Sequence, residues 1–221
     1  GGFKDYLQLL KTPTLLLIIL AQAFAVIILI PLIHFGTEFF VSARGMGEKE
    51  ARLALGIMAL VAGALGNSLS GFLGDRLARY TRGAYALLAG IGFLLGWPCL
   101  MIGFQAEDRW VFLPALTLGC FFYFLCMPAV NTQIANVVSP TQRATAWALA
   151  IFILHLLGDT ASPWAFGRVS RQIGREQAFV YFSAALVASG VCCLIAAMTA
   201  RRDVARVMQS MDEAEAREHT G

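Results

Sequence analysis

Charged residues are scarce in this sequence. Only 14% of its 221 residues are Asp, Glu, Lys or Arg, whereas 58% are hydrophobic. Soluble domains contain about 25% charged residues, so this composition excludes an ordinary soluble domain and predicts an integral membrane protein. The formal net charge of +3 is small, and the short arginine clusters lack interleaved aromatic residues. A nucleic-acid partner is therefore not expected.

The motifs of several enzyme classes are also missing. The sequence contains no HExxH, no glycine-rich phosphate loop and no GxSxG, so an ATP-driven pump or an intramembrane hydrolase has no recognisable machinery. The five cysteines are an odd number, lie within apolar stretches and form no CxxC. Neither a disulfide framework, a metal site nor a cofactor is expected, and the cysteines are interpreted as small core residues.

Long apolar runs dominate what is present. About 20 apolar residues cross a bilayer, and the chain has six such stretches, approximately 13–41, 51–73, 84–104, 111–135, 144–167 and 177–200. Backbone groups in lipid must satisfy their own hydrogen bonds, so each stretch is predicted to be a helix. The charged segment 201–221 is predicted to be a tail that forms an amphipathic or frayed helix at the membrane surface.

The distribution of positive charge indicates an orientation. Six spans place both chain ends on one side, and cytoplasmic segments are richer in Lys and Arg. The side of the two ends has ten such residues: Lys4, Lys11, Arg76, Arg79, Arg82, Arg143, Arg201, Arg202, Arg206 and Arg217. The other side has seven: Arg44, Lys49, Arg52, Arg109, Arg168, Arg171 and Arg175. We therefore expect both ends in the cytoplasm and the protein in the cell (inner) membrane.

The segment GFLGDRLARYTR, residues 71–82, connects the second and third predicted spans. It resembles the GxxxDRxGRR loop of the major facilitator superfamily, and the matching residues are Gly71, Asp75, Arg76 and Arg79. Ala78 and Tyr80 depart from the family pattern. A carboxylate here can interact with the positive end of a neighbouring helix dipole, so the motif is predicted to act as a gate latch. The alternative is that its arginines only mark the cytoplasmic side.

A second pattern covers residues 127–163. It reads MPAVNTQIANVVSPTQRATAW and, a few residues later, IFILHLLGDTASP. This is similar to the tenth and eleventh helices of the spinster-like branch of the superfamily, the lysolipid and sphingolipid transporters. Met127 departs from the pattern, because relatives tend to have Gly before this proline.

The resemblance has consequences for fold and function. It implies an all-α membrane protein whose six transmembrane helices form the C-terminal half of a twelve-helix major facilitator fold, with the N-terminal half as its partner. It also implies a secondary active transporter for a lysophospholipid or sphingosine-type amphiphile that works by alternating access, with protons as the coupling ion.

His155 and Asp159 lie four residues apart within an apolar stretch. They share a helix face and can form a hydrogen bond. An ionised Asp at the centre of a membrane costs about 2.5–3.5 kcal/mol, which suggests a functional role. We predict that the pair handles substrate or protons, that Asp159 is buried on the face turned toward the other half, and that Gly158 and Pro163 loosen or break the helix. The alternative is that Asp159 caps a half-helix through the amides of residues 160–162.

Other polar residues within or near the spans are further candidates. Asn131 and Gln133 are predicted to bind the polar part of a substrate, although amides also join helices. His34 and Glu38 form another pair four residues apart and are predicted to belong to an outer gate. Arg143 is predicted to lie at the inner mouth, where it either gates or simply marks the interface.

Other functions stay open at this stage. The protein could carry another organic anion or a drug-like amphiphile on the same fold. A six-span membrane enzyme that uses His155 and Asp159 is a possibility from a different class. A passive assembly module would tolerate the loss of Asp75 or Asp159.

Overall fold

The computed structural model describes residue 9 and residues 11–218, with side chains up to Gln209. Lys4 and the side chain of Arg217, both used above to orient the chain, lie outside this part. The described helices are α2 (Pro13–Arg44), α3 (Glu48–Ala78), α4 (Ala84–Gln105), α5 (Arg109–Asn136), the 3₁₀ turn η1 (Pro140–Gln142), α6 (Arg143–Leu154), the π-helix η2 (His155–Ala161), α7 (Ser162–Ile173), α8 (Arg175–Ser183) and α9 (Ala185–Glu218).

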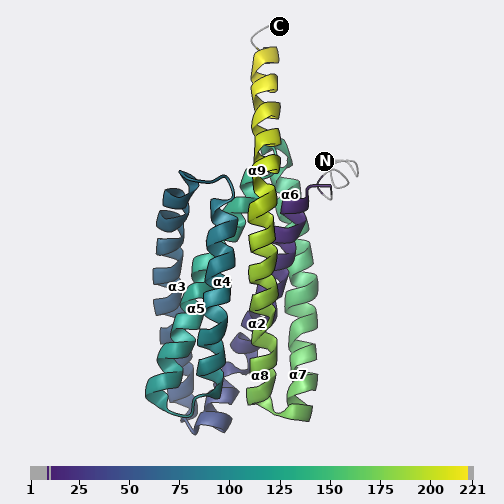
Figure 1. Cartoon of the computed structure of the whole chain (residues 1–221). Coiled ribbons are helices and arrows are strands. Elements are labelled where there is room, and N and C mark those ends of the chain that lie inside the picture. The colour runs from purple at the N-terminus through teal and green to yellow at the C-terminus, as the bar shows by residue number, and fades with distance from the viewer. Residues whose placement is uncertain (1–8, 10, 219–221) are drawn as a thin grey trace.

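Six helical stretches of the described chain are long and apolar enough to cross a membrane. Four are α2, α3, α4 and α5; the fifth runs from η1 to α7, and the sixth combines α8 with most of α9. The predicted all-α fold class with six transmembrane helices is confirmed. Figure 1 shows them as one bundle, beyond which α9 projects at the end where α2 begins. This end, with the connections 79–83 and 137–142, is called the terminal end, and the opposite end is called the loop end.

Helix α2 is the most buried span, whereas α3 and the stretch from α6 to α7 are the most exposed ones. Helix α5 packs along both α3 and α4, and α9 packs along both α2 and α4. Lipid tails are as apolar as leucine, so helices in a membrane associate mainly through close packing and hydrogen bonds. The exposed faces of α3 and α6–α7 are therefore available to lipid or to another part of a larger protein.

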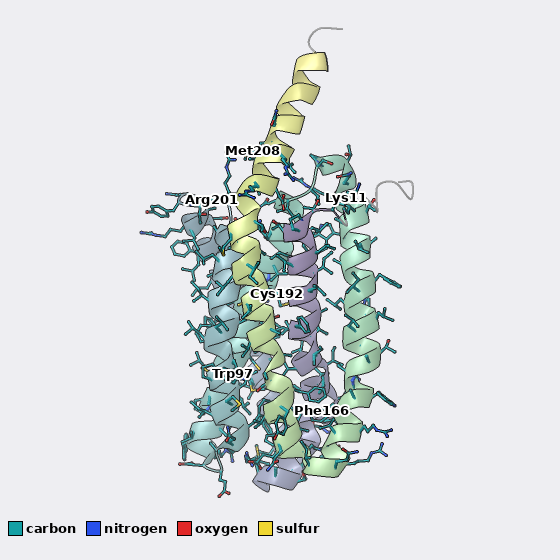
Figure 2. All side chains as sticks on the ribbon, turned by 45° about the vertical axis from the view of Figure 1, so that its right-hand side comes forward. Lys11, Trp97, Phe166, Cys192, Arg201 and Met208 are labelled. Atoms are coloured by element: carbon teal, nitrogen blue, oxygen red, sulfur yellow. The ribbon has the colours of Figure 1, made fainter. Side chains whose placement is uncertain are left out.

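Phenylalanine rings from four helices pack together at the loop end. Phe104 of α4 stacks on Phe179 of α8 with 4.7 Å between the ring centroids, and Phe39 and Phe166 lie 5.3 and 4.5 Å from Phe179. Figure 2 shows Phe166 at this end. Aromatic pairs contribute about 0.5–1.5 kcal/mol each beyond their burial. The cluster therefore holds the loop ends of α2, α4, α7 and α8 together.

A buried carboxylate fixes α9 to α2 at the terminal end. Asp203 is only 4% exposed and accepts hydrogen bonds from the Thr14 amide at 3.2 Å and the Thr14 hydroxyl at 2.6 Å. Amides in the first turn of a helix lack partners within the helix and favour negative charge. Asp203 therefore supplies from α9 the cap that α2 lacks in its own sequence.

The observed helices extend past several predicted boundaries. Helix α9 continues without interruption to Glu218, so the predicted start of a tail at Arg201 falls inside a helix; residues 219–221 of that tail lie outside the described chain. Helix α2 ends at Arg44, where Gly45 adopts a left-handed conformation with φ 63°. Hydrophobicity marks only the apolar part of a span, whereas the helix continues until a capping residue ends it.

Gly66 of α3 is expected to tolerate no side chain. A Cβ at this position would lie 2.8 Å from the carbonyl oxygen of Phe121 and 2.9 Å from the amide nitrogen of Leu125, both in the backbone of α5. Gly66→Ala should force α3 away from α5 and lower the free energy of unfolding by about 1–3 kcal/mol. Gly56→Ala is the matched control, because a Cβ there has no neighbour within 4 Å. Thermal unfolding in detergent, followed by tryptophan fluorescence, measures the difference, and equal melting temperatures would contradict the prediction.

Candidate functional site

A π-helical turn widens the fifth span near its middle. Residues His155–Ala161 form η2 and connect α6 to α7 without an interruption, so the predicted break is a widened helix instead. Pro163 has no amide hydrogen to donate to the carbonyl of Asp159, which removes one bond of a regular α-helix. The Ser162 hydroxyl donates to the Gly158 carbonyl at 2.5 Å. Such π-turns are common at functional sites.

Gly158 determines which face of this span meets the bundle. A Cβ at Gly158 would lie 2.4 Å from Cγ1 of Val26, so a side chain here would separate the span from α2. Gly158 is buried, whereas the residues before and after it, 155–157 and 159–161, are exposed. His155 and Asp159 are among these exposed residues.

His155 and Asp159 interact as predicted, through Nδ1 of the ring and Oδ2 of the carboxylate. Their side chains are 61% and 38% exposed. The predicted burial of Asp159 is therefore not found within the described chain, because the span packs through Gly158 and turns the pair outward. Among the described hydrogen bonds, none joins Asp159 to the amides of residues 160–162, and the Thr160 hydroxyl donates to the His155 carbonyl at 3.2 Å.

Asn131 and Gln133 of α5 have different surroundings. Asn131 is half-buried and accepts a hydrogen bond from Nε2 of Gln22 on α2 at 3.0 Å. Gln133 is fully buried, and neither atom of its amide has a hydrogen-bond partner in the described structure. The hydroxyl of Tyr123, on the same helix, is also buried without a described partner. The Asn131 amide is therefore partly accessible, whereas Gln133 lies inside the bundle.

Gln22 is a residue that the sequence analysis missed. It is the polar partner of Asn131 and is 7% exposed. The sequence contained a signal for this residue, because a lone Gln within a long apolar helix needs a hydrogen-bond partner. What the sequence could not supply was the identity of that partner, which comes from a different helix.

The residues of the predicted latch lie at the C-terminal end of α3. Gly71, Asp75 and Arg76 belong to the helix itself rather than to a loop, and Arg79 is its C-cap. Asp75 accepts a hydrogen bond from the Tyr85 hydroxyl of α4 at 2.5 Å. The structure thus joins the carboxylate to the first turn of the next helix through a side chain.

The glycine that permits this contact is Gly74. A Cβ at Gly74 would lie 2.4 Å from Cε1 of Tyr85, whereas a Cβ at Gly71 has no neighbour within 4 Å. Arg76 and Arg79 make no ion pair with a described residue. In the described chain, Gly71 and these arginines are therefore open to partners from elsewhere.

At the loop end, His34 and Glu38 do not pair with each other. His34 Nδ1 lies 2.9 Å from the Ile30 carbonyl oxygen, and Glu38 forms an ion pair with Arg175 of α8 at 2.8 Å. Helices α2 and α8 are also joined by Arg44, whose side chain is 2% exposed and whose Nη1 lies 3.2 Å from Glu176. The sequence analysis placed both arginines only in the charge count, because their partners are distant in sequence.

Arg143, at the start of α6, caps the preceding span. Its Nε donates to the carbonyl oxygen of Ala135 at 3.2 Å, and its side chain is exposed. A positive charge at the C-terminal end of α5 is favoured by the helix dipole. Arg143 thus has a structural role in the connection between the fourth and fifth spans. Its place at the inner mouth stays a prediction.

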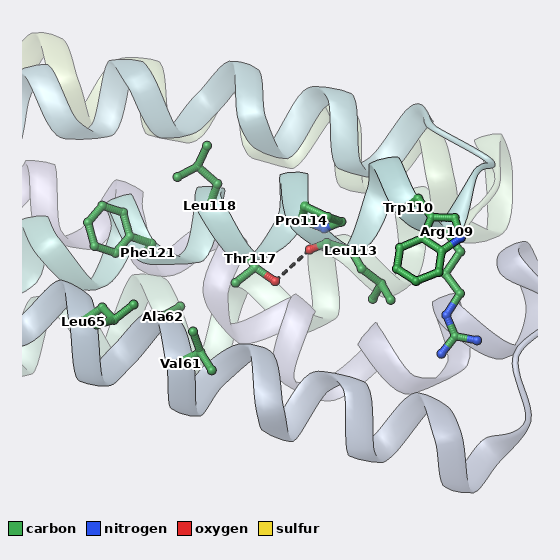
Figure 3. Close-up of a pocket in the computed structure, with 10 residues that line it drawn as sticks. All are labelled: Val61, Ala62, Leu65, Arg109, Trp110, Leu113, Pro114, Thr117, Leu118 and Phe121. Atoms are coloured by element: carbon green, nitrogen blue, oxygen red, sulfur yellow. Dashed lines mark hydrogen bonds between the residues drawn. The ribbon is translucent and has the colours of Figure 1, made fainter.

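Helices α3 and α5 also enclose an apolar groove of about 670 Å³ (Figure 3). Two of its polar side chains have partners, since Arg109 pairs with Glu50 at 2.5 Å and the Thr117 hydroxyl donates to the Leu113 carbonyl at 2.7 Å. The groove is otherwise mainly apolar and can receive an apolar chain.

Comparisons with known proteins agree with this architecture. Residues 2–163 match the model of the Major Facilitator Superfamily. A protein of Mycolicibacterium smegmatis named MFS-type efflux pump is 27% identical over 214 residues, which cover 92% of this chain and 48% of that protein. An Arabidopsis thaliana protein named probable sphingolipid transporter spinster homolog 3 is 27% identical over 125 residues, which cover 57% of this chain and 24% of that protein.

A solved structure shares the fold. The crystal structure of a bacterial homolog of the human lysosomal transporter Spinster, in an inward-facing and unoccupied conformation, matches with a TM-score of 0.67 at 21% identity. The match covers 95% of this chain and 51% of that chain. The chain therefore spans about half the length, or less, of the proteins it resembles. The matches to spinster homologues confirm its resemblance to the spinster-like branch.

The bond between Tyr85 and Asp75 generates a prediction about α3 and α4. Tyr85→Phe removes the donor and should lower the free energy of unfolding by about 0.5–1.5 kcal/mol. Asp75→Asn should have a smaller effect, because the amide oxygen still accepts the bond. Tyr80→Phe is the control, since Tyr80 is 79% exposed. Thermal unfolding measures all three; a larger loss in Asp75→Asn than in Tyr85→Phe would show that the charge, and not the hydrogen bond, holds the two helices.

Proposed function

This chain belongs to the major facilitator superfamily, and we propose that it is the C-terminal half of a transporter that moves a lysophospholipid or sphingosine-type amphiphile by alternating access. It is an integral, multi-pass membrane protein of the spinster-like type. In support of a half, it spans 48% of the M. smegmatis protein and 51% of the bacterial Spinster homolog. The N-terminal half would supply the facing surface.

The observation that carries this proposal is the outward-facing His155–Asp159 pair. Ionisable groups in a membrane span almost always face a protein interior or a water-filled cavity, because contact with lipid is costly. The pair is exposed in this chain and lies on one of its two least buried spans. An aqueous cavity between two halves would hydrate the pair, and in this fold the substrate binds at such an interface.

The pair is also suited to move a proton. His155 and Asp159 share one hydrogen bond, so a proton added from the open side goes to the imidazole ring and turns the hydrogen bond into an ion pair with Asp159. Loss of the proton to the other side returns the ring to its neutral form. We propose that this change couples substrate movement to a proton gradient, with the π-turn giving the pair room to reorient.

The substrate would lie between polar and apolar walls. The Asn131 amide is held by Gln22 through its oxygen, which leaves its NH₂ group free to donate to a polar headgroup. Gln133 would join this site only if α5 moves, because it is buried here. In support of a lipid-like substrate, one relative is named a sphingolipid transporter.

Gates at the two ends complete the proposal. At the terminal end, proposed to be cytoplasmic in the cell membrane, Gly71, Asp75, Arg76 and Arg79 would contact the other half. Arg143 lies at the same end. His34 and Glu38 would belong to the gate at the loop end, where Glu38 is anchored by Arg175.

A second candidate is a carrier for another organic anion or a drug-like amphiphile. It is favoured by the M. smegmatis relative, which is named an efflux pump and matches 92% of this chain. Both candidates use the same fold and the same face, so the transported molecule distinguishes them.

Transport by the full-length gene product in proteoliposomes tests the proposal. We expect lysophospholipid flux that increases with a pH gradient, and Asp159→Asn should reduce it to the gradient-independent level because Asn cannot form an ion pair with a protonated His155. Glu107→Gln is the control, since Glu107 is exposed in the connection between α4 and α5. Gradient-driven flux that survives in Asp159→Asn would remove Asp159 from the mechanism. No lysolipid flux in folded protein would favour the second candidate.

The chain by itself is expected not to transport. Its outward face needs an opposing surface to enclose a substrate, and lipid would cover it otherwise. Co-expression of the first six helices of the complete gene product should restore flux to these 221 residues. Full activity of the isolated chain, measured in the same liposomes, would contradict the half-transporter proposal.

A further inference from the structure

A groove of about 470 Å³ lies at the terminal end between α4 and α9. Its floor is apolar and includes Leu87 of α4 together with Leu194 and Met198 of α9. Its mouth is polar, with Arg201 on α9 and Thr81 in the connection that precedes α4. The groove therefore combines a slot for a hydrocarbon chain with a cation at one end.

Close backbone packing fixes the shape of this groove. Gly83 precedes α4, and a Cβ there would lie 2.5 Å from the carbonyl oxygen of Ala197 on α9. The two helices thus meet at van der Waals distance just below the mouth. Asp203 docks the same segment of α9 on Thr14 of α2, so α9 is held on both sides.

The docking of Asp203 determines the direction of Arg201. Residues two apart on a helix point about 200° apart, so Arg201 faces away from α2 and toward α4. Figure 2 shows Arg201 at the level where α9 leaves the bundle. Arg201 makes no hydrogen bond or ion pair with a described residue, and its side chain is exposed. Its guanidinium is free to bind an anion.

The surroundings of the mouth add positive charge and a donor. Arg79 and Arg82, on the connection beside the groove, also form no ion pair within the described chain. The Thr81 hydroxyl accepts a long bond of 3.4 Å from the Gly83 amide, which leaves its own proton free to donate. A phosphate group matches this combination of guanidinium and hydroxyl donors.

The apolar floor continues along the outside of the bundle. Ile91 and Leu95 follow Leu87 on α4, and Val191 and Ile195 lie beside Leu194 on α9; these four side chains are exposed. Their positions extend the apolar floor toward the middle of the membrane, and the eight residue steps from Leu87 to Leu95 correspond to about 12 Å along α4, which accommodates part of an acyl chain. The face is distinct from the span that contains His155.

We propose that this groove binds an anionic phospholipid of the surrounding bilayer, with an acyl chain on the apolar floor and the phosphate on Arg201 and Thr81. The α3–α5 groove is a useful contrast, because its arginine, Arg109, is paired with Glu50, whereas Arg201 has no acidic partner in the described chain. The bound lipid would clamp the terminal ends of α4 and α9. It is a bilayer component and not the transported molecule.

Lipid binding to the full-length protein, measured by native mass spectrometry, tests this inference. Phosphatidylglycerol should be retained more tightly than phosphatidylcholine of the same chain length. Arg201→Gln should weaken phosphatidylglycerol binding about tenfold, because a charge-assisted hydrogen bond to phosphate is lost. Arg202→Gln is the matched control: it removes the same charge from the next residue, which does not line the groove, and should change binding less than about twofold.

The results of this experiment distinguish a specific lipid site from general attraction to a basic surface. Equal losses in the two variants would show general attraction to a basic surface and would overturn the site. Equal retention of both lipids by the wild type would overturn it as well. Arg201→Lys should recover part of the binding, and unchanged melting temperatures in lipid-free detergent would show that the variants are folded. The experiment measures lipid binding and not flux, so a failed transport assay would not change the conclusion about this groove.

Discussion

The absence of hydrogen-bond partners in a lipid bilayer constrains almost every polar group of this bundle. Polar atoms within the spans must find partners inside the protein or in a hydrated cavity. The structure shows several solutions: hydroxyls of the π-turn bond to carbonyls of the same helix, Gln22 binds Asn131 across two helices, and Arg44 reaches a carboxylate and aromatic rings. The side chains of His155 and Asp159 form their only described hydrogen bond with each other and remain exposed. At this exposed pair, the polar groups of the bundle need a hydrated cavity or another part of the protein.

The two ends of the bundle are held differently. At the loop end, aromatic rings from four helices and ion pairs between α2 and α8 form connections in several directions. At the terminal end, Asp203 docks α9 on α2, and Asp75 joins α3 to α4 through one side chain. Several arginines there have no partner in the described chain. The loop end is thus joined by contacts among several helices, whereas the terminal end retains charged groups without a partner in the described chain.

Some features of the site were accessible from the sequence. The four-residue spacing of His155 and Asp159 predicts their hydrogen bond, because such residues share a helix face. The same spacing did not predict the behaviour of His34 and Glu38, since Arg175 competes for Glu38 from another helix. Asp159 is exposed in this chain, where Gly158 packs on α2, and its burial against the other half stays a prediction. Spacing determines which residues are neighbours on one helix but not which face that helix presents.

The sequence by itself therefore determined the class, the number of spans and the family. These follow from hydrophobic runs long enough to cross a bilayer and from motifs of fixed spacing, both of which are local properties of the chain. Only the tertiary structure decided that Gln22 is the partner of Asn131, that Gly74 rather than Gly71 accommodates Tyr85, and that Asp203 is part of the bundle. Each of these depends on how two helices approach and rotate against each other. That arrangement is set by packing over the whole bundle, and no single stretch of sequence contains it.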